Sequence, residues 1–93
     1  MIIKVQHEGQ WWVYDNLQRV RYNKVKIDYH EYQKLIYEGT ADIILLQPKD
    51  IGAPVEMYEV CYRNTRDEEK LMVFDEVAYL CNDNGQTIEK LVI

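Results

Sequence analysis

Only one short stretch of this chain carries the start and stop signals of a helix. Asp28 is of the residue type that caps helix N-termini, and Glu31 follows at the third position, as in a capping box. Gly39 is suited to the left-handed residue that ends many helices. The apolar side chains between these signals recur at helical spacing and form one stripe: Tyr29, Tyr32, Leu35 and Ile36. We therefore expect one helix at about residues 28–38, packed on one face of a sheet.

The remaining segments alternate between apolar and polar residues, or run apolar over short lengths, which favours strands. Residues 2–6 and 56–63 alternate, and the apolar run 41–47 stops at Pro48. Hydrophobic residues make up 47% of the chain and charged residues 29%, which are ordinary values for a globular domain. We predict a single α+β domain over residues 1–93, with mostly antiparallel β-sheet of about five to seven short strands.

Two adjacent tryptophans constrain the first hairpin. Glu8 and Gly9 form a plausible two-residue turn, which sets Val5 opposite Trp12 on an apolar face. Neighbouring residues of a strand point to opposite faces, so Trp11 falls on the polar face. In this register we expect Trp11 to be exposed and Trp12 to be packed away, and a one-residue slip would exchange the two tryptophans.

Within residues 19–27 the apolar positions switch once, from even-numbered to odd-numbered residues. Val20 and Tyr22 share one parity, whereas Val25 and Ile27 share the other. Such a slip is typical of a β-bulge or a tight bend, and Asn23 is of a type that tolerates one. We expect an irregularity near Asn23.

Residues 69–82 admit two interpretations, because their apolar residues also suit a second helix at about 66–82. The Asn-Gly pair at residues 84–85 favours strands, since Asn-Gly is a strong type I′ hairpin signal. That turn sets three pairs opposite each other: Tyr79 and Lys90, Cys81 and Ile88, and Val77 and Val92. We predict strands on both sides of a turn at residues 75–76.

The charge is uneven along the chain. Residues 1–55 carry seven acidic and seven basic side chains, whereas residues 56–93 carry nine acidic and four basic ones, giving the net −5. Nucleic-acid binders usually show the opposite sign, so direct DNA or RNA binding is disfavoured. The candidate acidic surface consists of Asp67, Glu68, Glu69, Asp75 and Glu76.

Catalytic and cofactor motifs are missing from the sequence. It has no Gly-rich phosphate loop, no zinc-protease motif and no nucleophile elbow. Cys61 and Cys81 do not form a CxxC pair, so we expect free thiols, with a single disulfide left open. The carboxylates at residues 75–76 lack the spacing of an EF-hand loop, and we expect a solvated turn there. We predict no enzyme, no cofactor and no metal.

The N-terminus does not resemble a signal peptide, and the longest apolar run, residues 43–46, is far too short to span a bilayer. We expect a cytoplasmic protein without membrane contact.

One candidate contact patch combines an aromatic side chain with nearby cations. Its members are Trp11, Arg19, Arg21, Lys24 and Lys26. If Arg21 lies across from Trp11, the two form a cation–π pair, and Trp and Arg are enriched at binding hot spots. The alternative is an edge strand protected by its charges.

Residues 78–90 resemble the ends of small proteins from Gram-positive phages and mobile elements, a resemblance that carries no site residues. It implies an accessory factor. Our leading hypothesis is a non-enzymatic interaction protein that binds and inhibits or modulates a host protein, for example one that handles nucleic acid or serves in defence. The alternative is a dimeric binder of a nucleotide-like ligand. We expect a homodimer; the identity of partner or ligand stays open.

Overall fold

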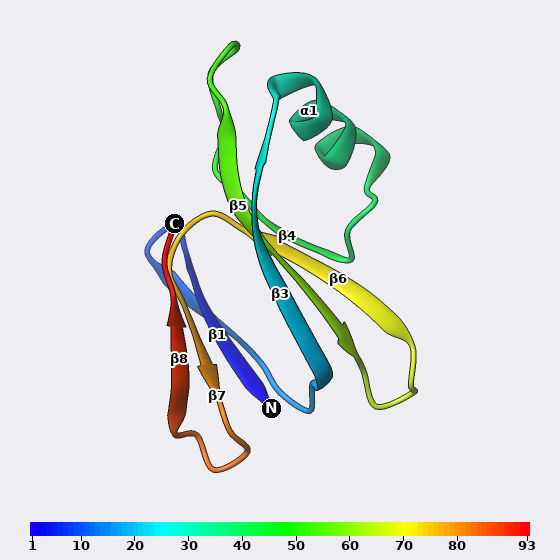
Figure 1. Ribbon diagram of the computed structural model, residues 1–93, viewed down its shortest axis with the longest axis vertical. Coiled ribbons are helices and arrows are strands. Elements are labelled where there is room, and N and C mark those ends of the chain that lie inside the picture. The colour runs from blue at the N-terminus through cyan, green and yellow to red at the C-terminus, as the bar shows by residue number, and fades with distance from the viewer.

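The chain forms eight strands and one helix in the computed structural model, which describes residues 1–93 (Figure 1). In chain order the elements are β1 (Ile2–His7), β2 (Gln10–Tyr14), β3 (Gln18–Ile27), α1 (Tyr29–Glu38), β4 (Ile43–Leu45), β5 (Val55–Arg63), β6 (Glu69–Phe74), β7 (Ala78–Cys81) and β8 (Thr87–Leu91).

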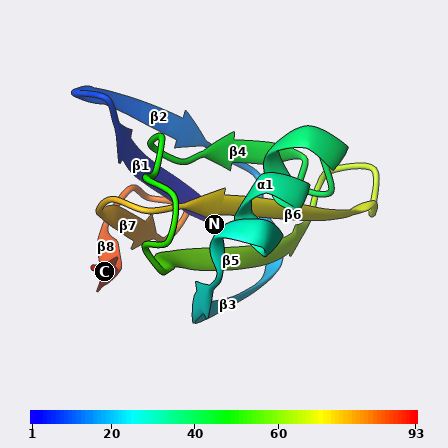
Figure 2. The ribbon, with the colours of Figure 1, turned by 90° about the horizontal axis from the view of Figure 1, so that it is seen from above.

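The strands form two four-stranded sheets. Sheet A has the order β2-β1-β7-β8, and sheet B has the order β3-β5-β6-β4. Figure 2 shows both orders from above. All pairs are antiparallel except β4 with β6, which is parallel. This confirms the predicted α+β class with mostly antiparallel sheet. The structure has eight strands, one more than the upper end of the expected range.

Helix α1 begins and ends where its sequence signals predicted. The Asp28 side chain accepts a hydrogen bond from the Glu31 backbone N–H at 2.8 Å. At the other end Gly39 adopts a left-handed conformation, with φ at 61°. Tyr32 and Leu35 are buried, which confirms the centre of the predicted stripe. No helix of the structure is both long enough and apolar enough to cross a membrane.

Sheet B is buried on both of its faces. One apolar layer lies between the two sheets, and a second lies between sheet B and α1. Strand β6 serves both layers, because Met72 and Phe74 belong to the first and Val73 to the second, each 0% exposed. The chain therefore stacks three layers in the order sheet A, sheet B and helix.

The predicted bulge near Asn23 is wrong. Strand β3 pairs with β5 in unbroken register from Arg21 to Ile27. The apolar phase changes because Tyr22 packs in the layer between the sheets, whereas Val25 packs in the layer below the helix. The irregularity lies earlier, between Gln18 and Arg21, where Arg19 has a φ of 50°.

The first hairpin has the predicted register but not the predicted burial. Val5 lies opposite Trp12, and Gln6 lies opposite Trp11. Trp11 is 51% exposed, as expected, but Trp12 is 42% exposed and is not packed away. The reason is that β2 is the edge strand of sheet A, at the margin of the layer between the sheets.

Residues 69–82 form strands β6 and β7, so the alternative of a helix at 66–82 is excluded. Tyr79 lies opposite Lys90 as predicted, but Cys81 lies opposite Thr87 and not Ile88, because the register shifts between Leu80 and Cys81.

The final hairpin turn is longer than the two residues expected. The Gly85 N–H donates to the carbonyl of Asn82, so the glycine is the last residue of the turn. Ile88 therefore leaves its predicted pair with Cys81, and Ile88 and Val92 are both at least half exposed. The buried residues of this hairpin are Ala78, Leu80, Cys81 and Leu91. Both cysteines are free.

Candidate functional site

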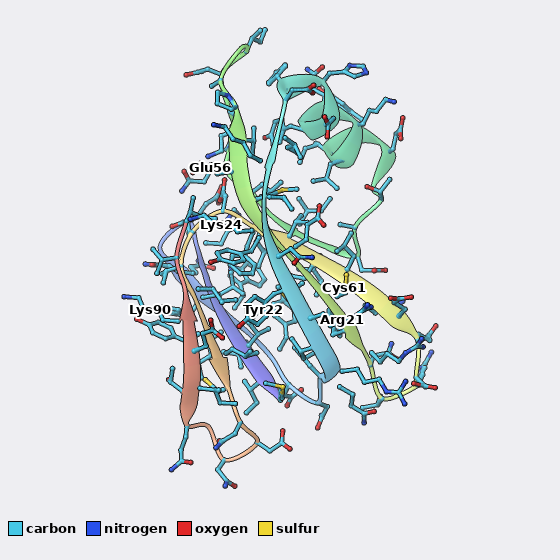
Figure 3. The ribbon with its side chains drawn as sticks, in the orientation of Figure 1. Arg21, Tyr22, Lys24, Glu56, Cys61 and Lys90 are labelled. Atoms are coloured by element: carbon cyan, nitrogen blue, oxygen red, sulfur yellow. The ribbon has the colours of Figure 1, made fainter.

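The structure does not bring the predicted contact patch together. Trp11 lies on β2 in sheet A, whereas Arg19, Arg21, Lys24 and Lys26 lie on β3, an edge strand of sheet B. Arg21 sits opposite Cys61 in the pairing of β3 with β5 (Figure 3). Its guanidinium donates to Glu69 Oε1 at 2.9 Å. The condition for a cation–π pair between Trp11 and Arg21 is therefore not met. The four cations instead follow the exposed edge of sheet B.

The predicted acidic surface is also divided. Asp67 and Glu68 lie in the β5–β6 loop and Glu69 begins β6, whereas Asp75 and Glu76 follow the other end of β6. The side chain of Asp75 is only 1% exposed. The expectation of a solvated turn with Asp75 on a shared acidic surface is wrong, because its carboxylate is enclosed by other polar groups.

A different surface stands out on the side of sheet A that faces away from sheet B. We call it the outer face and define it by Lys4, Trp11, Val13, Tyr79, Thr87 and Lys90. One row crosses all four strands, with Val13 opposite Lys4, Lys4 opposite Tyr79 and Tyr79 opposite Lys90. The alternate residues of β1 and β7 belong to the core, so these side chains point away from it.

Two aromatic rings form the centre of the outer face. The ring centroids of Trp11 and Tyr79 are 5.7 Å apart with a tilt of 38°. The ammonium of Lys90 lies 5.7 Å from the centroid of the Tyr79 ring, a cation–π distance. A shallow hollow of about 260 Å³ is lined by Lys4, Trp11, Tyr79 and Thr87. Figure 3 shows Lys90 on the side of β8 away from Tyr22.

The hairpin turn at residues 8–9 fixes Trp11 in this position. Glu8 and Gly9 both have positive φ, at 51° and 76°. Two successive left-handed residues match a type I′ turn, whose twist suits adjacent strands. The turn returns the chain directly onto β1, so Trp11 takes its place beside Gln6 and within reach of Tyr79.

A second hollow, of about 390 Å³, is lined by residues of β3, β5 and β6 in sheet B. Its lining residues are Arg19, Val20, Arg21, Tyr62, Arg63 and Glu69. Two of its three cations are paired, since Arg21 contacts Glu69 at 2.9 Å and Arg63 contacts Asp67 at 3.8 Å. Burial, with smaller contributions from the charge of Asp42 and from Tyr14, raises the pKa of Tyr62. The hollow therefore combines a neutral phenol with a partly balanced set of arginines.

A third group of side chains combines Asp75 and Glu76 with His7, a grouping that the sequence did not predict. His7, at the end of β1, lies beside Glu76, with 3.8 Å between His7 Nδ1 and Glu76 Oε2. Asp75 accepts from the backbone N–H of Gln47 at 3.0 Å and pairs with the Lys49 ammonium at 3.0 Å. Three segments far apart in the chain meet here. The proximity depends on the pairing of β1 with β7, which local sequence pattern does not reveal.

No protein-family model, curated protein or solved structure matches this chain.

Proposed function

We propose that this protein is a non-enzymatic interaction protein that binds a partner protein through the outer face of sheet A. The observation that supports this proposal is the contact between Trp11 and Tyr79 on a sheet face that no other layer covers. Trp and Tyr are the residue types that most often dominate binding energy at protein interfaces. Their rings are already in contact, so less side-chain freedom is lost on binding.

The charges of the outer face favour an acidic partner surface. Lys4 and Lys90 flank Tyr79 on either side, in the same row across the sheet. A partner that presents carboxylates around one apolar side chain complements this arrangement, because opposite charges across an interface set specificity and association rate. The shallow hollow beside Trp11 has the size of a side chain and not of a drug-sized ligand.

Self-association through the same face is disfavoured on the same grounds. In a two-fold symmetric dimer each patch meets its own copy, so Lys4 and Lys90 would approach equivalent lysines. The predicted homodimer, if it forms, would use another surface, and light scattering at high protein concentration tests it.

We further propose that the partner is a host protein that the chain inhibits or modulates, as an accessory factor of a phage or mobile element would. Support comes from residues 78–90, the segment with that resemblance, because it contributes Tyr79, Thr87 and Lys90 to the outer face.

A displayed random-peptide library tests the binding chemistry without knowledge of the partner. We expect the immobilised protein to enrich peptides in which Asp or Glu flank an apolar residue. Trp11→Ala and Tyr79→Ala should each reduce the recovery of these peptides at least tenfold, whereas Tyr37→Ala, on the exposed side of α1, should not. Enrichment of basic peptides, or equal recovery by all variants, would contradict the proposal.

A second candidate function uses the hollow beside β3. Three arginines around Tyr62 suit a small phosphate-bearing ligand, and about 390 Å³ falls within the usual range for ligand pockets. Thermal shift against a nucleotide panel and inorganic phosphate tests it. A ligand at a hundredfold excess over its dissociation constant should stabilise the fold by about 2.7 kcal/mol. The shift should vanish in Arg19→Ala, and the absence of any shift in the parent protein would exclude this function.

A further inference from the structure

We propose that His7, Asp75 and Glu76 form a binding site for a divalent transition-metal ion, best matched by Zn²⁺. Each residue offers one ligand atom, and these three atoms lie within 4.8 Å of one another. Zinc bound at about 2.1 Å by tetrahedral ligands holds them roughly 3.4 Å apart, so each pair of ligand atoms needs to close by at most about 1.4 Å.

Two unsatisfied atoms point to a missing positive partner. His7 Nδ1 and Asp75 Oδ1 are both buried and have no hydrogen-bond partner, and they are the only such side-chain atoms in the protein. The Asp75 side chain is 1% exposed and that of His7 is 13% exposed. Buried polar atoms without a partner are costly and rare. One cation coordinated by Nδ1 and Oδ1 would satisfy both.

The surrounding hydrogen bonds already orient the two carboxylates. Gln47 donates its backbone N–H to Asp75 Oδ2, and Lys49 pairs with the same oxygen, which leaves Oδ1 available. Glu76 Oε2 accepts from the Gln47 side-chain amide at 3.0 Å and from the Glu8 backbone N–H at 3.1 Å. Metal ligands in proteins are commonly held by such outer partners.

The charge of the cluster matches a dication. Asp75, Glu76 and Glu8 supply three negative charges, and Lys49 supplies one positive charge, so the sum with a neutral imidazole is −2. The Glu8 carboxylate lies 3.8 Å from His7 Nε2 and can hold the ring's other N–H toward itself. Neutral imidazole favours zinc and its neighbours over Mg²⁺ and Ca²⁺, which prefer oxygen ligands alone.

A bound ion would add a further link between three segments that hydrogen bonds already join at this point. His7 comes from the end of β1, the two carboxylates come from the crossing between β6 and β7, and their outer partners come from residues 47–49. The site would therefore fix the turn end of the β1–β2 hairpin, close to Trp11. This inference does not depend on the proposed protein partner.

Calorimetric titration of the tag-free protein with Zn²⁺, and separately with Mg²⁺, tests the site. We expect one Zn²⁺ per chain and no measurable Mg²⁺ binding. His7→Ala and Glu76→Gln should each weaken Zn²⁺ binding at least a hundredfold, with circular dichroism confirming that each variant is folded. His30→Ala is the matched control, because it removes the only other histidine, which is exposed on α1, and should leave affinity unchanged.

Binding of Zn²⁺ by a free thiol is the competing explanation for a positive titration. Cys61→Ser should bind Zn²⁺ as tightly as the parent protein, and the Co²⁺ derivative should lack thiolate charge-transfer absorption. An absence of Zn²⁺ binding, unchanged affinity in His7→Ala, or loss of affinity in Cys61→Ser would each overturn the proposal.

Discussion

Trp11 and Tyr79 are in contact, with ring centroids 5.7 Å apart, although β1 separates their two strands. Lys4 lies on the intervening strand, directly opposite Tyr79. The centre of the outer face thus depends on three strands, and it forms only when sheet A is assembled. The pair lies on a face of sheet A that no other layer covers, and Trp11 is 51% exposed in the free protein.

Truncating one core residue and one residue of the outer face tests whether Trp11 contributes to the core. Phe74 is 0% exposed and stacks on Tyr58, so Phe74→Ala should lower the free energy of unfolding by about 3–5 kcal/mol. Trp11→Ala removes a half-exposed ring and should cost less than about 1.5 kcal/mol. Urea denaturation compares the two, and a similar loss for both would mean that Trp11 is a core residue.

The β5–β6 loop and the β7–β8 loop have the same hydrogen-bonding pattern. One substitution in each loop should therefore change the stability of the protein in opposite directions. The side-chain oxygens of Asn64 and Asn82 each accept two backbone N–H groups. The fourth loop residue is left-handed in both, Asp67 with φ 58° and Gly85 with φ 84°. Asp67→Gly should therefore stabilise the protein by about 0.5 kcal/mol, and Gly85→Ala should destabilise it by about 1 kcal/mol.

Thermal unfolding of the two loop variants checks this prediction. An added Cβ at Gly85 would meet no atom within 4 Å, so any destabilisation there is conformational and not steric. A lower melting temperature for Asp67→Gly would show that its side chain makes an interaction that outweighs the backbone strain.

The free energy of unfolding should fall at alkaline pH, because partly or fully buried tyrosines ionise there. Burial raises the pKa of Tyr14, and burial is also the main cause of the raised pKa of Tyr62. An unfolded tyrosine ionises near pH 10, so the folded state retains these protons longer. Their contribution to stability is complete below about pH 10 and is lost as the pH rises through the higher folded-state pKa.

Urea unfolding between pH 9 and pH 11.5 measures this effect, in about half-unit steps chosen to bracket the tyrosine range. Tyr62→Phe should make the decline shallower, because one group with a raised pKa is gone. A decline of the same steepness in Tyr62→Phe would assign the alkaline sensitivity to other groups.

Local signals in the sequence were sufficient for the helix and for most strands. Asp28 and Gly39 mark the helix because capping chemistry is local, and alternation marks strands for the same reason. The faces of β3 were misjudged because both sides of sheet B are buried, so a change of apolar phase at Asn23 records a change of layer and not a bulge.

The candidate sites were less predictable, since they depend on strands that meet far apart in sequence. Trp11 was identified, but its neighbours proved to be Tyr79 and Lys90 and not Arg21. Asp75 was assigned to the acidic surface, and no local pattern linked it to His7. Only the pairing of β1 with β7, and the contact of residues 47–49 with the β6–β7 crossing, brings them together.

The most direct measurement is the affinity of the purified protein for the strongest acidic peptide from the library, compared between Trp11→Ala and Tyr37→Ala. Both variants remove one exposed aromatic ring, on sheet A and on the helix respectively. If the outer face is the binding surface, the dissociation constant should rise at least tenfold for Trp11→Ala and less than twofold for Tyr37→Ala. Equal effects of the two variants, or a larger effect at Tyr37, would contradict that role for the outer face.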